Sequence, residues 1–274
     1  MGFEKEKRFI VLANWKMHKT RGQSVEYVNA LNQAVQDAHS DIELIICGPF
    51  TVLEALSKAA YSPAISIGGQ NVHEKDWGPY TGEISAPMLA DVGCRYCMIG
   101  HSERRTYFSE TDEMVNRKGR ALHKARVTPI VCIGETIEER EKGLTFSKLE
   151  KQIVMCFDRF SNREMARTVI LYEPIWAIGT GNIATPKQAE EAHQFIRQMV
   201  RTLYSRETAF MTRIVYGGSV RSSNVSSMLN GEDIDGVGIG SDSLDVQNLL
   251  KIAMSCARAN LNRRVSDAAF GGEK

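Results

Sequence analysis

The sequence lacks any long hydrophobic run: nowhere in its 274 residues does a stretch approach the roughly 18 consecutive apolar residues that indicate a membrane-spanning helix. It also lacks a charge imbalance, because 34 basic and 33 acidic side chains give a formal net charge of +1. Without a strong overall field, we expect no binding to nucleic acid or to an anionic membrane surface, and any selectivity for anions must be local.

Signs of secretion are also missing. The opening segment "MGFEKEKRFIVLANW" does not contain the apolar stretch of a signal peptide. The six cysteines lie mostly within apolar runs, which is typical of reduced, buried thiols and not of a disulfide framework. We therefore expect a cytoplasmic protein.

Motifs for metals and cofactors are weak or absent. Cys94, Cys97 and His101 have a metal-like spacing, but one cysteine pair without a second pair is a poor indication of zinc. The glycine-rich "GTGNIAT" has neither the spacing of a dinucleotide fingerprint nor the Lys-Ser/Thr of a P-loop. Cys132, in "VCIG", is assigned to packing. We expect neither metal nor cofactor.

What the sequence does contain is a repeated succession of short apolar runs from end to end. They are apolar throughout, which is typical of parallel strands covered on both faces, and they lie far enough apart for crossover helices. No linker or low-complexity segment separates them, so we predict one closed (β/α)8 barrel over residues 1–258, in preference to an open doubly wound sheet. Residues 259–274 form a polar tail that we expect to fray. The eight runs end at Trp15, Pro49, Gln70, Ser102, Gly134, Pro174, Gly218 and Ser241.

Two helix starts are also predicted. Thr185 and Pro186 with Gln188 form a start signal before "AEEAHQFIRQMVRTLY", and Ser147 with Glu150 forms another before "KQIVMCFDRF".

Reacting groups in such barrels lie at the carboxyl ends of the strands, which defines a short set of candidates. Each has an ordinary structural explanation when taken alone: a solvated lysine, a structural histidine, a salt-bridge glutamate or a glycine turn. The candidates are Asn14, Lys16, His101, Glu103, Glu173, Gly217, Gly218, Ser219, Gly240 and Ser241.

Together these residues fit one task. The glycine-containing ends of the seventh and eighth strands predict a phosphate site made of backbone N–H groups. Glu173 supplies a base, His101 a hydrogen-bond donor for a carbonyl, and Lys16 a positive charge for a developing enediolate. The pattern therefore predicts proton abstraction next to the carbonyl of a phosphorylated substrate.

Six long motifs then indicate a family. The sequence resembles the triosephosphate isomerase family over residues 7–256, and this family is itself the standard example of a Glu base, a neutral His and a closing loop. The resemblance implies interconversion of glyceraldehyde 3-phosphate and dihydroxyacetone phosphate without a cofactor. The motifs are "NWKMHKT", "GGQNVHEKDWGPYTGEIS", "IGHSERR", "VCIGETIEERE", "YEPIWAIGTG" and "IVYGGSV".

The resemblance also implies residue roles. Glu173 would move the proton between the two carbons, and neutral His101 would polarise the carbonyl. Lys16 and Asn14 would hold the substrate and stabilise the enediolate, with Glu103 within reach of Lys16.

Phosphate binding and closure are implied in the same way. The N–H groups of Gly179, Ser219, Gly240 and Ser241 would hold the phosphate. Residues 174–184 resemble the family's lid, whose closure excludes water from the base.

A homodimer is a further implication of the resemblance. Residues 71–85 match the loop that inserts beside the first loop of a partner, with Thr81 near its tip and Met17 in the receiving segment. The aromatic pair Trp77 and Tyr80 argues modestly against an ordinary surface loop.

The eighth strand departs from the family pattern. Gly238 stands where a leucine that clamps the catalytic carboxylate is usual, and Ser241 and Asp242 replace a glycine and a small residue. Asn182 replaces a common lysine in the lid. We expect activity to survive these changes, although Gly238 leaves open an isomerase for a tetrose phosphate.

Two alternatives belong to other classes. Glu103 and Glu173 could form the carboxylate pair of a glycoside hydrolase, against which the predicted phosphate site and Lys16 argue. A barrel kept only for binding is disfavoured by the complete set of Asn14, Lys16, His101 and Glu173.

Overall fold

All strands in the described part of the chain are parallel and close into one barrel, in which each strand pairs with its neighbours in chain order and β8 pairs with β1. The structure is a computed structural model that describes residues 8–35, 42–178 and 182–270. The predicted (β/α)8 barrel is confirmed. Its strands are β1 (Phe9–Asn14), β2 (Ile42–Cys47), β3 (Ile65–Gly69), β4 (Tyr96–Ile99), β5 (Thr128–Ile133), β6 (Val169–Tyr172), β7 (Arg213–Tyr216) and β8 (Gly236–Ile239).

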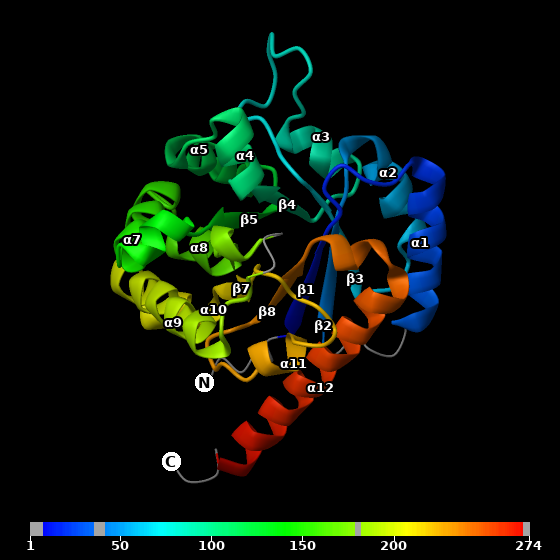
Figure 1. Cartoon of the computed structure of the whole chain (residues 1–274). Coiled ribbons are helices and arrows are strands. Elements are labelled where there is room, and N and C mark those ends of the chain that lie inside the picture. The colour runs from blue at the N-terminus through cyan, green and yellow to red at the C-terminus, as the bar shows by residue number, and fades with distance from the viewer. Residues whose placement is uncertain (1–7, 36–41, 179–181, 271–274) are drawn as a thin grey trace.

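Helices surround the strands, and the segment between β3 and α3 projects from the body as a long loop (Figure 1). In the described residues, no helix is long and apolar enough to cross a membrane. The helices are α1 (Arg21–Ala34), α2 (Phe50–Ala59), α3 (Ala86–Asp91), α4 (Ser102–Phe108), α5 (Asp112–Lys124), α6 (Ile137–Glu141), α7 (Thr145–Cys156), α8 (Asn162–Arg167), α9 (Pro186–Leu203), α10 (Arg206–Met211), α11 (Val225–Met228) and α12 (Val246–Phe270), with short 3₁₀ turns η1 (Ile175–Ala177) and η2 (Ser241–Leu244).

The strands are mainly apolar because each one serves two cores. On β1, Ile10 and Leu12 belong to the cluster inside the barrel, whereas Phe9 and Val11 belong to the cluster between the barrel and its helices. Successive side chains of a strand point to opposite faces, so both faces of these strands are packed and most of their residues are apolar.

The strands end one to three residues earlier than the sequence predicted. The first strand ends at Asn14 instead of Trp15, and the fourth at Ile99 instead of Ser102. The candidate polar residues therefore lie at the last strand positions or in the segments that directly follow the strands, at one end of the barrel.

One of the two predicted helix starts is confirmed and the other is wrong. Thr185 caps α9 and Gln188 completes the capping box. The helix α7 begins at Thr145 with Leu144 as its N-cap. Ser147 lies in its first turn, and its hydroxyl donates to the Leu144 carbonyl (3.1 Å).

The last helix runs through the predicted boundary at residue 258. The backbone of α12 is helical from Val246 to Phe270, whereas the polar sequence predicts a frayed tail from residue 259. No glycine or proline interrupts this segment before Gly271, so nothing in the sequence stops the helix. Residues 271–274 lie outside the described residues.

A buried ionic cluster closes the other end of the barrel. Glu43, near the start of β2, accepts hydrogen bonds from Arg213 (2.6 Å) and from the Tyr96 hydroxyl (2.6 Å). Arg213 also donates to the Tyr96 oxygen (3.1 Å). Because these residues come from the amino-terminal ends of their strands, the cluster serves stability and not the reaction.

Arg126, two residues after the end of α5, has a strained backbone conformation. Arg126 has φ 62°, a left-handed conformation that favours glycine. We expect Arg126→Gly to stabilise the fold by about 0.5–1 kcal/mol. Urea unfolding should show this, while Arg120→Gly in the interior of the same helix should destabilise by about 1 kcal/mol. A loss of stability in Arg126→Gly would contradict the prediction.

Candidate active site

A cavity of about 370 Å³ lies at the carboxyl ends of the strands. Glu103 is not part of its lining, but it contacts two residues that are, Lys16 and His101. Gly179 lies outside the described residues. The cavity brings together Asn14, Lys16, His101, Glu173, Ser219, Gly240 and Ser241.

Glu173 and His101 are buried and in contact. Their exposed fractions are 4% and 6%, and His101 Nε2 lies 3.1 Å from Glu173 Oε1. The second oxygen, Oε2, accepts from the Ser102 N–H (3.2 Å). Both carboxylate oxygens are thus oriented, which places the candidate base in a fixed position.

The protonation of His101 is set by its place at the start of α4. Its Nδ1 accepts from the Glu103 N–H (3.2 Å), which requires an unprotonated Nδ1 and puts the proton of the neutral ring on Nε2. Burial disfavours the imidazolium, but the Glu173 carboxylate outweighs it and raises the pKa of His101. The neutral ring satisfies both neighbours, since Nε2–H donates to Glu173.

Lys16 is held in an unusual backbone conformation. It has φ 52°, and its N–H donates to Asn14 Oδ1 (3.0 Å). Its ammonium group pairs with Glu103 Oε1 (2.5 Å). A non-glycine residue in this region costs about 1–3 kcal/mol and occurs mainly at functional sites. The strain is consistent with a role for Lys16 in the reaction.

Gln70 holds the loop that carries Lys16, although the sequence analysis gave it no role. Its Nε2 lies within hydrogen-bond distance of the Lys16 carbonyl (2.9 Å), the Cys47 carbonyl (2.9 Å) and Asn14 Oδ1 (3.4 Å). One carboxamide therefore joins the ends of the first three strands. Its only signal was its position at the end of a predicted strand.

Glycines and short polar residues line the cavity at the ends of β7 and β8. Gly217, Gly218 and Ser219 follow β7, and Gly240 caps η2, which begins at Ser241. Ser241 does not have a positive φ, so its replacement of a glycine introduces no such strain. Backbone N–H groups at glycines and small residues, next to the start of a helical turn, are well suited to binding a phosphate group.

Asp242 lies at the rim of the cavity and does not cap the following helix. It lines the cavity, whereas Asp245 accepts from the Asn248 N–H (2.9 Å) in the first turn of α12. The helix is therefore capped by Asp245, and Asp242 adds a negative charge to the rim of the site.

The start of the lid is fastened on two sides. The Trp176 indole donates to the buried carboxylate of Glu135 (2.9 Å), which also contacts Arg140 (3.1 Å). The Ser219 hydroxyl donates to the Ala177 carbonyl (2.5 Å). The role of Glu135 was missed from the sequence because it depends on a partner 41 positions away.

The thiols take no part in this site. All six cysteines are buried and free. Burial raises the pKa of the Cys132 thiol well above its ordinary value, which fits packing and not nucleophilic chemistry. Among the described residues, no cluster of His, Cys, Asp or Glu could hold a metal ion.

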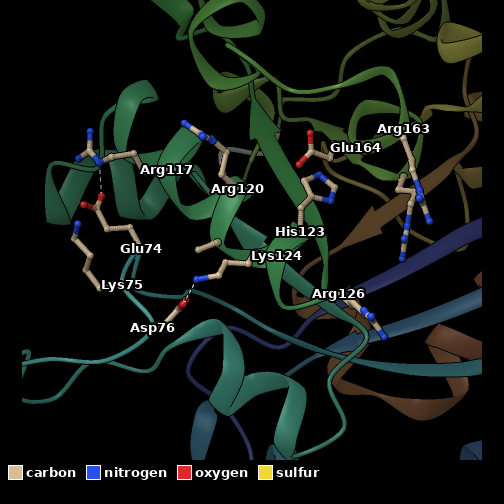
Figure 2. Close-up of a pocket in the computed structure, with 12 residues that line it drawn as sticks. Glu74, Lys75, Asp76, Arg117, Arg120, His123, Lys124, Arg126, Arg163 and Glu164 are labelled. Carbon is tan, nitrogen blue, oxygen red and sulfur yellow. Dashed lines mark hydrogen bonds and ion pairs between the residues drawn. The ribbon is translucent and has the colours of Figure 1, made fainter.

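A second concavity of about 780 Å³ lies outside the barrel, where α5 and α8 meet the start of the projecting loop (Figure 2). Its lining is mainly basic and shares no residue with the first cavity. At one edge Arg117 pairs with Glu74 and Lys124 with Asp76, which fastens the base of the loop to α5.

Comparisons with known proteins agree on one family. The family model described as triosephosphate isomerase matches residues 9–256. The triosephosphate isomerase of Endomicrobium trichonymphae is 46% identical over 243 residues, covering 89% of this chain and 96% of the relative. Those of Alkaliphilus oremlandii and Acetivibrio thermocellus are 42% and 43% identical, covering 89% and 90% of this chain and 97% and 98% of the relatives.

Proposed function

This chain belongs to the triosephosphate isomerase family, and from that premise we propose how its own residues interconvert D-glyceraldehyde 3-phosphate and dihydroxyacetone phosphate. The contact between Glu173 and His101 in the cavity is the observation that carries the proposal. Neither the described part of the cavity nor the matched relatives favour the tetrose phosphate alternative.

Glu173 acts as the base. It accepts a proton from the carbon next to the carbonyl and returns it to the adjacent carbon, so no proton is gained or lost overall. His101, with its proton on Nε2, donates to the substrate oxygen on which negative charge develops. The bound substrate takes the place of the direct contact between the two side chains.

Lys16 and Asn14 provide the electrostatic support. The ammonium group of Lys16 faces the cavity beside Glu103, so its positive charge is available to an enediolate. Asn14 fixes the backbone of Lys16 through its side-chain oxygen. Glu103 acts on Lys16 and does not touch the substrate.

The phosphate lies against the ends of β7 and β8. The N–H groups of Ser219, Gly240 and Ser241 bind it, and Gly179, the fourth donor expected from the sequence, lies outside the described residues. The position of η2 beside Gly240 supports this assignment, because the start of a helical turn favours negative charge.

The test is the value of kcat/KM on the triose phosphates, compared with erythrose 4-phosphate. We expect a value near 10⁷ M⁻¹s⁻¹ or so for the triose, close to the range set by diffusion, and a far lower one for the tetrose. A preference for the tetrose would overturn the assignment of the substrate.

We also propose a homodimer formed through residues 71–85. Trp77 on this loop is 72% exposed and Met17 is 93% exposed, which is unusual for large apolar side chains in a lone chain. The pairs that fasten the base of the loop to α5 present it as a fixed projection.

Met17→Asp should therefore convert the dimer to a monomer, because a buried, unpaired carboxylate opposes association. Light scattering should give twice 30.6 kDa for the wild type and 30.6 kDa for the variant. Met254→Asp, the same change at a residue of α12 that is 57% exposed, is the control and should remain dimeric. A monomeric wild type at micromolar concentration would refute the dimer.

A cytoplasmic location belongs to the same proposal. It is supported by the six free, buried thiols, which need no oxidising compartment.

A further inference from the structure

Strand β6 places an apolar side chain directly below the catalytic carboxylate. Leu171 and Glu173 are two residues apart, so they point to the same face of the strand. Leu171 is 3% exposed, belongs to the cluster inside the barrel and lines the cavity with Glu173. It therefore separates the base from the barrel interior.

Two glycines leave the space that Leu171 fills: Gly217, which directly follows the neighbouring strand β7, and Gly238 on β8, the next strand after it. A Cβ added at Gly238 would lie 2.8 Å from Leu171 Cδ1. A Cβ added at Gly217 would lie 2.9 Å from the same atom and 3.2 Å from Glu173 Cγ. The two contacts below 3.0 Å would force Leu171 Cδ1 to move, so these glycines and the present position of the leucine fit together as a set.

Gly238 also points into the barrel. It pairs in register with Leu12, which belongs to the inner cluster, and residues side by side in a parallel pair face the same way. A leucine at position 238 would enter the volume that the side chain of Leu171 occupies.

We infer that Leu171 is a positioning residue for the reaction, supplying from β6 the apolar contact to Glu173 for which the family pattern uses a leucine at position 238. This inference rests on the proposed function of the cavity. The contact holds the carboxylate in one orientation and keeps water from its lower side, which makes it a more effective base.

The same geometry bears on the choice of substrate. Because Leu171 fills the space beside Gly238, the glycine does not enlarge the cavity for a longer sugar phosphate. The departure of the eighth strand from the family pattern is thus offset by the sixth strand.

The experiment uses the full chain and three variants: Leu171→Ala, Gly238→Leu and the double variant. Leu171→Ala should lower kcat about 10²-fold, with little change in KM, because the base loses its position and the phosphate site is untouched. Gly238→Leu should also lower kcat, since its side chain collides with Leu171. The double variant should recover at least about tenfold over the product of the two single effects.

Two further variants separate positioning from packing. Val169→Ala truncates a buried residue of the same strand and inner cluster, farther from the cavity, and should lower the Tm while leaving kcat almost unchanged. Leu171→Met should keep most of the wild-type kcat because it preserves the volume.

The proposed function and the inference about Leu171 would be overturned by different results. A wild type without triosephosphate isomerase activity would refute the proposed function. An active wild type whose kcat is unchanged by Leu171→Ala would refute the inference. So would a double variant that shows no recovery although its Tm lies within a few degrees of the wild type.

Discussion

Glu173→Gln should lower kcat/KM for the triose phosphates by a factor of about 10²–10⁴. The amide has nearly the same shape as the carboxylate but cannot accept the proton that the reaction moves. The amide also forms a less favourable set of hydrogen bonds than the carboxylate does. The wild-type oxygens face two donors, the Ser102 N–H and His101 Nε2, and the amide offers one of them an N–H₂ group instead.

The loss should appear in both directions of the reaction and in exchange of the substrate's carbon-bound proton with solvent. Glu191→Gln, the same change in an exposed turn of α9, should leave kcat/KM unaltered. The folded state should persist in Glu173→Gln, because removing a buried charge relieves a desolvation cost. Retention of more than a tenth of the activity would contradict the role of Glu173 as the base.

Arg213→Met should destabilise the fold by about 3–5 kcal/mol, since it leaves the buried carboxylate of Glu43 without its main cation. Arg8 offers little replacement, because it lies 3.9 Å away and its side chain is 38% exposed. Urea unfolding at a fixed protein concentration measures the effect. Activity per folded molecule should stay the same, because the cluster lies at the other end of the barrel.

The pH dependence of the free energy of unfolding provides a second test of this prediction. Burial alone would raise the pKa of Glu43, but Arg213 and the Tyr96 hydroxyl outweigh it and hold that pKa below its ordinary value. In the wild type, the contribution of the Glu43 carboxylate to folding stability is therefore fully present at pH values above the ordinary glutamate pKa. It is lost as the pH falls through the lowered pKa. In Arg213→Met this pH dependence should reverse, so that stability rises as the pH falls, because protonation removes the unpaired buried charge of Glu43.

The matched control removes the charge together with its partner. In Arg213→Met with Glu43→Gln, the new amide still accepts from Tyr96, and most of the lost stability should return. Equal destabilisation in the single and the double variant would mean that packing of the arginine stem, and not its charge, is responsible.

The architecture was predictable because its signals are local and repeated. Short apolar runs at crossover spacing indicate parallel strands, and the rule that reacting groups follow such strands selected Glu173 and His101 without coordinates. The strand ends were placed one to three residues late, because the predicted ends included the residues, mainly glycine and polar ones, with which the following loops begin.

The residues that sequence reasoning missed depend on distant partners. Gln70 matters because it reaches two other strands, and Glu135 because the indole of Trp176 turns toward it. Leu171 is one apolar residue among many until the glycines beside it are known. The start of α7 was misplaced because Ser147 has a capping signature that the chain does not use.

The bonds of Gln70 have a consequence for how the enzyme responds to dilution. The proposed interface loop begins one residue after Gln70, and the same side chain holds the strained backbone of Lys16. In the proposed dimer, association of two chains and ordering of the proposed catalytic lysine would therefore be thermodynamically linked, so that part of the free energy of one would stabilise the other. Separated subunits should lose turnover because Lys16 relaxes, even though no residue of the partner takes part in the chemistry proposed here.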